Sequence, residues 1–134
     1  MHKVRWEDLL DHASNKPIYI QIAEWLENEI LSGRVEAGEK IYSQYQLADR
    51  FNINPATAAK GLNLLAEEEI VHKRRGLGMF VEEKAVNIIK EKRKNKTLKR
   101  MLREIVKEAN YLDVSMDELS EMLRKIHEEE REEE

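Results

Sequence analysis

The sequence predicts a mainly helical protein of the α+β class, in which a helical domain ending in a β-hairpin precedes a two-helix hairpin. Apolar residues recur at steps of three and four along much of the 134-residue chain, which is the spacing of one helix face. Gly and Pro are scarce, at five and two residues, as expected of a mostly helical chain. One Gly-rich turn between two short apolar segments indicates the hairpin.

The first element of the predicted helical domain, residues 17–82, is a helix over residues 17–32. Pro17 suits its first turn and Gly33 suits the position just after its end. Its apolar face consists of Ile18, Ile22, Trp25, Leu26 and Ile30. Residues 1–16 form an N-terminal segment, and an apolar set there predicts a short helix that docks on the core or on a partner subunit. That set is Trp6, Leu9, Leu10 and Ala13.

Two capping signals predict the next two helices. Ser43 followed by Gln46 forms a capping box at the start of a short second helix. Asn54 followed by Pro55 predicts an N-cap and first residue for a third helix, which extends to about Glu68. The predicted buried residues of this third helix are Ala58, Leu62 and Leu65.

The hairpin follows directly. Residues 70–75 predict a strand that becomes basic at its end, residues 76–78 a turn, and residues 79–81 a returning strand. The order helix, helix, tight turn, helix, hairpin is that of a winged helix-turn-helix, an arrangement that binds DNA.

The rest of the chain predicts a helical dimerisation hairpin over residues 83–128 and an acidic tail over residues 129–134. A long helix ends at Asp113-Val114, and Ser115 caps a second helix. A two-helix hairpin has a wide apolar face and little core, so the apolar stripe predicts a homodimer. The predicted dimer residues are Leu98, Met101, Leu102, Ile105, Leu112, Leu119, Met122, Leu123 and Ile126.

Charge divides this C-terminal third into two halves. Residues 84–107 contain ten Lys or Arg against two Glu, and residues 108–134 contain eleven acidic against three basic side chains. The near cancellation favours ion pairing across the hairpin or between subunits. Two alternatives stay open, namely that the basic helix extends the contact with DNA, and that it is only solvated.

Residues 17–81 resemble the DNA-binding domain of the GntR family of bacterial transcription regulators. The matching segments are 17–22, Gly33, 37–38, 41–43, 47–48, 54–58 and 76–81. Only about fifty residues follow, which is similar to the short YtrA-like branch and implies that two C-terminal helices form the dimer. The chain departs from the family pattern at Tyr42, Tyr45 and Ala59, where Pro, Arg and Arg are usual.

Three places supply the predicted DNA contacts. The N-terminus of the second helix can bind a phosphate, the third helix offers polar side chains to base edges, and the basic hairpin can approach a phosphate or the minor groove. The predicted residues are Ser43, Gln44, Tyr45, Asn54, Thr57, Lys60, Lys73, Arg74, Arg75 and Gly76.

Structural roles compete with several of these assignments. Asn54 can act as a cap alone, Tyr45 can fill the core, and Lys60 can be merely solvated. Because strand side chains alternate, at most two of the three basic residues 73–75 share a face.

These features predict a dimeric, sequence-specific transcription regulator, a repressor that binds an inverted repeat, with release by a small-molecule effector left open. One alternative is a helical protein–protein interaction module without sequence-specific DNA binding. Another is a basic helix that binds an anionic membrane or RNA.

Other functions lack their motifs. The chain has no Cys, its four His form no His-x-x-x-His pair, and no phosphate-binding loop occurs. We therefore expect no enzyme activity, cofactor or metal. No apolar run reaches the roughly 18–20 residues that a membrane helix needs, so we expect a cytoplasmic protein.

Overall fold

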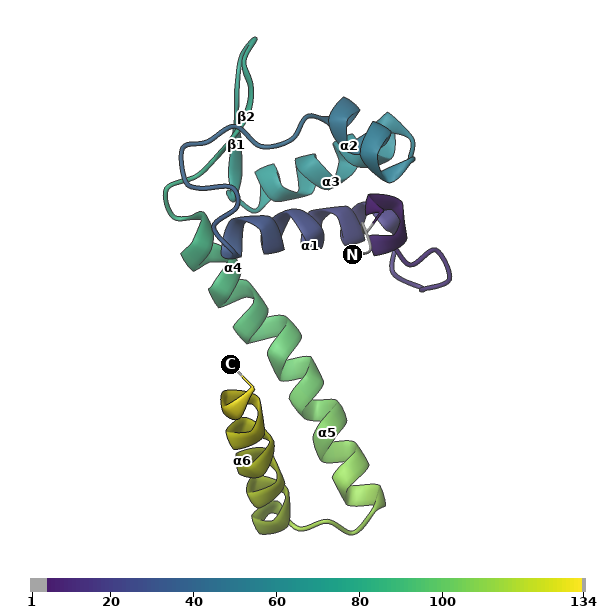
Figure 1. Cartoon of the computed structure of the whole chain (residues 1–134), viewed down its shortest axis with the longest axis vertical. Helices are drawn as coiled ribbons and strands as arrows, with labels where there is room; N and C mark the ends of the chain where they lie inside the picture. Colours follow the sequence, from purple (N-terminus) through teal and green to yellow (C-terminus); the bar gives the residue numbers. More distant parts are fainter. Residues whose placement is uncertain (1–4, 134) are drawn as a thin grey trace. The chain divides into compact units, whose positions relative to one another are not determined.

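The computed structural model describes residues 5–133 (Figure 1). These residues divide into two compact units, the first ending at Glu91 and the second beginning at Lys92. The first unit contains η1 (Trp6–Leu9), α1 (Ile18–Leu31), α2 (Gln44–Phe51), α3 (Pro55–Glu67), β1 (Val71–Arg74), β2 (Gly78–Val81) and most of α4 (Ala85–Arg93). The second unit contains the π-helical turn η2 (Lys94–Leu98), α5 (Lys99–Tyr111) and α6 (Met116–Glu132). The predicted mainly helical fold with a two-stranded wing is confirmed.

The core of the first unit forms where α1 packs on α3 (Figure 1). The backbones approach closely because α3 presents Gly61. A Cβ atom at this position would lie 2.9 Å from the carbonyl oxygen of Tyr19. The side chains of Ile22, Leu26 and Leu65 are fully buried there.

The predicted helix starts are confirmed at α2 and α3. The amide of Gln46 donates to Ser43 Oγ (3.1 Å), and Ser43 N donates to Gln46 Oε1 (2.9 Å), so both bonds of the capping box are present. Asn54 Oδ1 accepts from the amide of Ala56 at 2.8 Å. Pro17 differs slightly from its prediction, because it is the N-cap of α1 and not a residue of its first turn.

The wing is an antiparallel pair in which Val71 lies opposite Val81 and Arg74 opposite Gly78. A segment not predicted to pair adds to its edge. Residues 38–41 lie along β2, where the amide of Gly38 donates to the carbonyl of Val81 (2.8 Å). The winged helix-turn-helix therefore has a third extended segment beside β2.

The described part of the N-terminal segment, residues 5–16, packs on the rest of the first unit and contains one 3₁₀ turn, η1, as its helix. Residues 1–4 of the predicted segment lie outside the described residues. The ring of Trp6 packs against Trp25 (4.6 Å between centroids) and Phe51 (5.2 Å). Leu10 is buried, whereas Leu9 and Ala13, predicted with it, are exposed. The segment thus docks on the core of its own chain.

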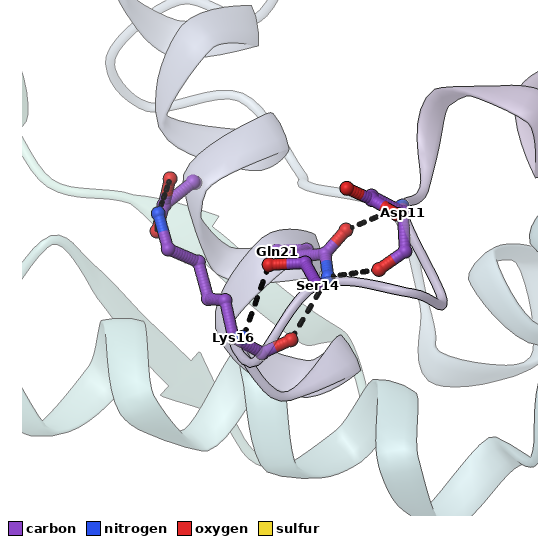
Figure 2. A network of polar contacts seen from close by, with 5 residues as sticks. Asp11, Ser14, Lys16 and Gln21 are labelled. Atoms are coloured by element: carbon purple, nitrogen blue, oxygen red, sulfur yellow. Dashed lines mark hydrogen bonds and ion pairs between the residues drawn. The ribbon is translucent and has the colours of Figure 1, made fainter.

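The loop between η1 and α1 is held by Gln21 (Figure 2). The side-chain amide of Gln21 donates to the carbonyls of Asp11 (2.8 Å) and Lys16 (2.9 Å). Its oxygen accepts from the amide of Asp11 (2.7 Å). Lys16 Nζ lies 2.9 Å from the carboxylate of Glu24. The charge of Lys16 is therefore already paired within the chain.

The first unit extends beyond the boundary predicted at residue 82. Ala85 and Ile89 on α4 are buried in its core, which is why the compact unit ends at Glu91. The long helix predicted after residue 83 is also not one regular α-helix, because the π turn η2 separates α4 from α5.

In the second unit the chain reverses between α5 and α6 (Figure 1). Asp113 has φ +55° in this turn, and the amide of Glu118 donates to Ser115 Oγ at 3.1 Å. Helix α6 ends at Glu132, so most of the predicted acidic tail, residues 129–134, is helical. Its run of Glu side chains continues as a solvated helix.

Candidate nucleic-acid interface

An open groove of about 520 Å³ lies between the N-terminus of α2, one face of α3 and the wing. The structure brings together five of the predicted DNA contacts in its lining. These are Ser43, Gln44, Tyr45, Lys73 and Gly76.

The N-terminus of α2 presents free backbone amides and an exposed aromatic side chain to this groove. Ser43 caps the helix, and the unpaired amides of the first turn carry the positive end of the helix dipole. The side chain of Tyr45 is 69% exposed, which excludes its alternative role in the core. This end of α2 can therefore bind a phosphate through amides and hydroxyl groups.

On α3, the residues predicted to contact DNA are not the residues that line the groove. Asn54 and Thr57 do not line the groove, and Asn54 acts as the N-cap. The ammonium of Lys60 lies 4.1 Å from the ring centre of Tyr19 in α1, a cation–π contact that replaces simple solvation. The exposed side chain of Asn63 does line the groove. Sequence reasoning missed it, although it lies one helical turn after Ala59.

The basic residues of the wing alternate between its two faces, as predicted. Lys73 lies opposite Met79 and lines the groove. Arg74 points to the other face, where its guanidinium lies 4.3 Å from the ring centre of Phe80. Arg75 is exposed beyond the end of β1, beside the turn formed by Gly76.

Lys40 is a further cation of the groove that sequence reasoning missed. Its position depends on the pairing of residues 38–41 with β2, which no local pattern indicates. Across residues 5–133, no carboxylate lies within ion-pair distance of Lys40 or of the basic residues 73–75. By comparison, Arg34 pairs with Glu29. The cations around the wing are thus available to an external anion.

The described residues contain neither a candidate metal cluster nor a helix that could span a membrane. In that part of the chain, no group of three or more His, Asp or Glu side chains is arranged to hold a metal ion. No helix there is both long and apolar enough to span a membrane.

A capped helix N-terminus, an exposed face of the following helix and an unpaired basic wing define a winged-helix DNA-binding protein. The family model described as "Bacterial regulatory proteins, gntR family" matches residues 18–81. The chain belongs to the GntR family of DNA-binding transcription regulators.

Similarity to known family members extends beyond the winged domain. The HTH-type transcriptional repressor YtrA of Bacillus subtilis is 31% identical over 117 residues, covering 87% of this chain and 89% of the repressor. A GntR family transcriptional regulator from Listeria monocytogenes has a TM-score of 0.69 at 29% identity, covering 87% of this chain and 98% of that one. A putative regulator of the family from Bacteroides thetaiotaomicron has a TM-score of 0.72 at 27% identity, covering 84% and 98%.

Proposed function

We propose that this protein is a dimeric repressor in which two winged domains bind the two halves of an inverted repeat. The main observation in favour of a dimer is the exposed apolar face of the second unit. Two copies related by a two-fold axis match a DNA site with two-fold symmetry, because each copy presents the same groove to one half-site.

The apolar face extends along both helices of the second unit. Leu98 at the end of η2 and Met101 and Leu102 on α5 are 42–50% exposed in the single chain. Met122, Leu123 and Ile126 on α6 are 45–53% exposed. Complete burial of such a side chain contributes roughly 1.5–3 kcal/mol. Because each side chain is only partly exposed, several must be covered together to stabilise a dimer. Ile105, Leu112 and Leu119 complete the proposed dimer surface.

Charge complementarity supports the same assembly. The first half of this region is strongly basic and the second half strongly acidic. Pairing between copies would bring unlike charges together, which orients the subunits more than it stabilises them, since exposed ion pairs contribute roughly 0–1 kcal/mol.

We assign the DNA contacts to three parts of the winged domain. The N-terminus of α2, with Ser43, Gln44 and Tyr45, binds a phosphate. The start of α3, with Asn54 and Thr57, meets base edges. The wing, with residues 73–76, reaches the adjacent phosphates or minor groove. Lys60 would have to leave Tyr19 to reach a phosphate, so it contributes least in this assignment.

Repression follows from occupation of promoter DNA, and the similarity to a protein named as a repressor supports this direction of regulation. Bacterial promoter DNA lies in the cytoplasm, which is the location the proposal implies. A small-molecule effector would act by lowering the affinity for the operator, and this affinity is the quantity by which candidate effectors are tested.

The test is selection of random duplex DNA on the purified full chain at about 150 mM salt, where non-specific binding is weakened. We expect enrichment of an inverted repeat. Enrichment of a single half-site would contradict the dimer. Lack of any enrichment by a folded protein would favour the alternative of an interaction module.

A further inference from the structure

The segment before α2 carries a cation to the base of the wing. Residues 38–41 are fixed to β2 by three backbone hydrogen bonds. The amide of Gly38 donates to the carbonyl of Val81, the amide of Val81 donates to the carbonyl of Glu39, and the amide of Ile41 donates to the carbonyl of Met79, at 2.8–2.9 Å. Lys40 is thereby held opposite Phe80. Its backbone position is set by the sheet and not by a free loop.

The side chain of Lys40 passes over Gly78. A Cβ atom at residue 78 would lie 2.7 Å from Lys40 Cε and 3.4 Å from Nζ. Any other residue at this position would therefore displace the lysine, and Gly78 also has φ +112°. The missing side chain leaves the space in which the ammonium group reaches the turn of the wing.

The surroundings of this ammonium group are basic. Lys40 borders the groove, and its position opposite Phe80 puts its side chain on the same face of the wing as Arg74. The nearby carboxylates have other partners, since Glu39 accepts from the amide of Glu36 (2.8 Å) and Glu82 lies 2.8 Å from His72 Nδ1. An anion at this face of the wing would thus meet Lys40 without competition from an internal ion pair.

We propose that Lys40 binds a phosphate of the DNA backbone and that Gly78 is the positioning residue that gives it access. The inference rests on the proposed DNA binding by the winged domain, and it extends the phosphate-binding surface from the hairpin to the segment before α2. This contact adds affinity for any duplex and does not read sequence.

The salt dependence of binding to a fluorescent random-sequence duplex tests the contact. Each phosphate contact adds about 0.9 to the slope of log affinity against log salt concentration. We expect Lys40→Met, which keeps the alkyl stem, to reduce this slope by about 0.9 for each bound copy and to weaken binding roughly eight-fold per copy at about 0.1 M salt. Lys40→Arg should retain the wild-type slope.

Lys16→Met is the matched control, because it removes an equal charge whose partner is already Glu24. It should leave the slope unchanged. Equal slopes for the wild type and Lys40→Met would overturn the proposal, as would an equal reduction by the control. Failure of the wild-type protein to bind any duplex would instead overturn the proposed function, and this inference with it.

A double variant tests whether Gly78 acts through Lys40. Gly78→Ala should reduce the slope in the wild-type background, but add no further reduction to Lys40→Met. Additive reductions in the double variant would show that Gly78 acts independently of Lys40, and would overturn its assignment as a positioning residue.

Discussion

The two units of this protein differ in how far their large apolar side chains are buried. In the first unit Ile22, Leu26 and Leu65 are completely buried. In the second unit the large apolar side chains of α5 and α6 lie on the surface, with Leu102 and Leu123 more than 40% exposed. The first unit has a core of its own, whereas the second leaves an apolar surface exposed, which a second copy covers in the proposed dimer.

The largest effect expected from this difference is on the core of the first unit. Leu26→Ala should lower the free energy of unfolding by about 2–5 kcal/mol, because it leaves a cavity where the wild-type side chain is fully buried. Urea denaturation followed by circular dichroism measures this. The matched variant Leu123→Ala, on the exposed face of α6, should have a much smaller effect at protein concentrations where the chain is monomeric.

A charge placed on the apolar face of α5 should have a similarly large effect, but on the assembly of the dimer and not on folding. Leu102→Glu places a charge in the proposed interface of each copy, and we expect the dimer dissociation constant to rise at least about 100-fold, or roughly 3 kcal/mol. Sedimentation velocity measures the change in mass. Tyr111→Glu adds the same charge at a side chain that is 84% exposed and outside the apolar stripe, and it should leave the mass unchanged.

The contact between α1 and α3 should tolerate little added volume. Gly61→Ala forces a shift of backbone around Tyr19 and should destabilise the first unit by roughly 1–3 kcal/mol. Differential scanning calorimetry gives the change in melting temperature. An unchanged melting temperature would contradict the close approach of these two helices.

The smallest expected effect concerns the cap of α2. Ser43→Ala removes the acceptor of the Gln46 amide and should cost about 1 kcal/mol of stability. Ser43→Thr keeps a hydroxyl group and should retain most of the stability that the cap contributes. If Ser43→Ala also weakens binding to DNA while Ser43→Thr does not, the hydroxyl serves both the cap and the phosphate.

Local chemistry explains which parts of the fold could be predicted from the sequence. The capping box at Ser43, the Asn54-Pro55 start of α3 and the wing turn at Gly76 each depend on residues a few positions apart. Their geometry follows from the backbone preferences of those residues alone.

The features that sequence reasoning missed depend on distant contacts. Lys40 joins the groove only because its segment pairs with β2, some forty residues later. Gly61 is explained by Tyr19 on another helix. A helix was predicted after residue 83, but no local pattern could show that its residues Ala85 and Ile89 belong to the core of the first unit.

In the proposed assembly, one unit binds DNA and the other joins two copies on it. The most direct test is the mass of the complex formed by the full chain on a duplex that carries the selected inverted repeat, measured by sedimentation. We expect two chains per duplex for the wild type, and loss of this paired complex for Leu102→Glu. A single wild-type chain per duplex at saturation would contradict the proposed assembly.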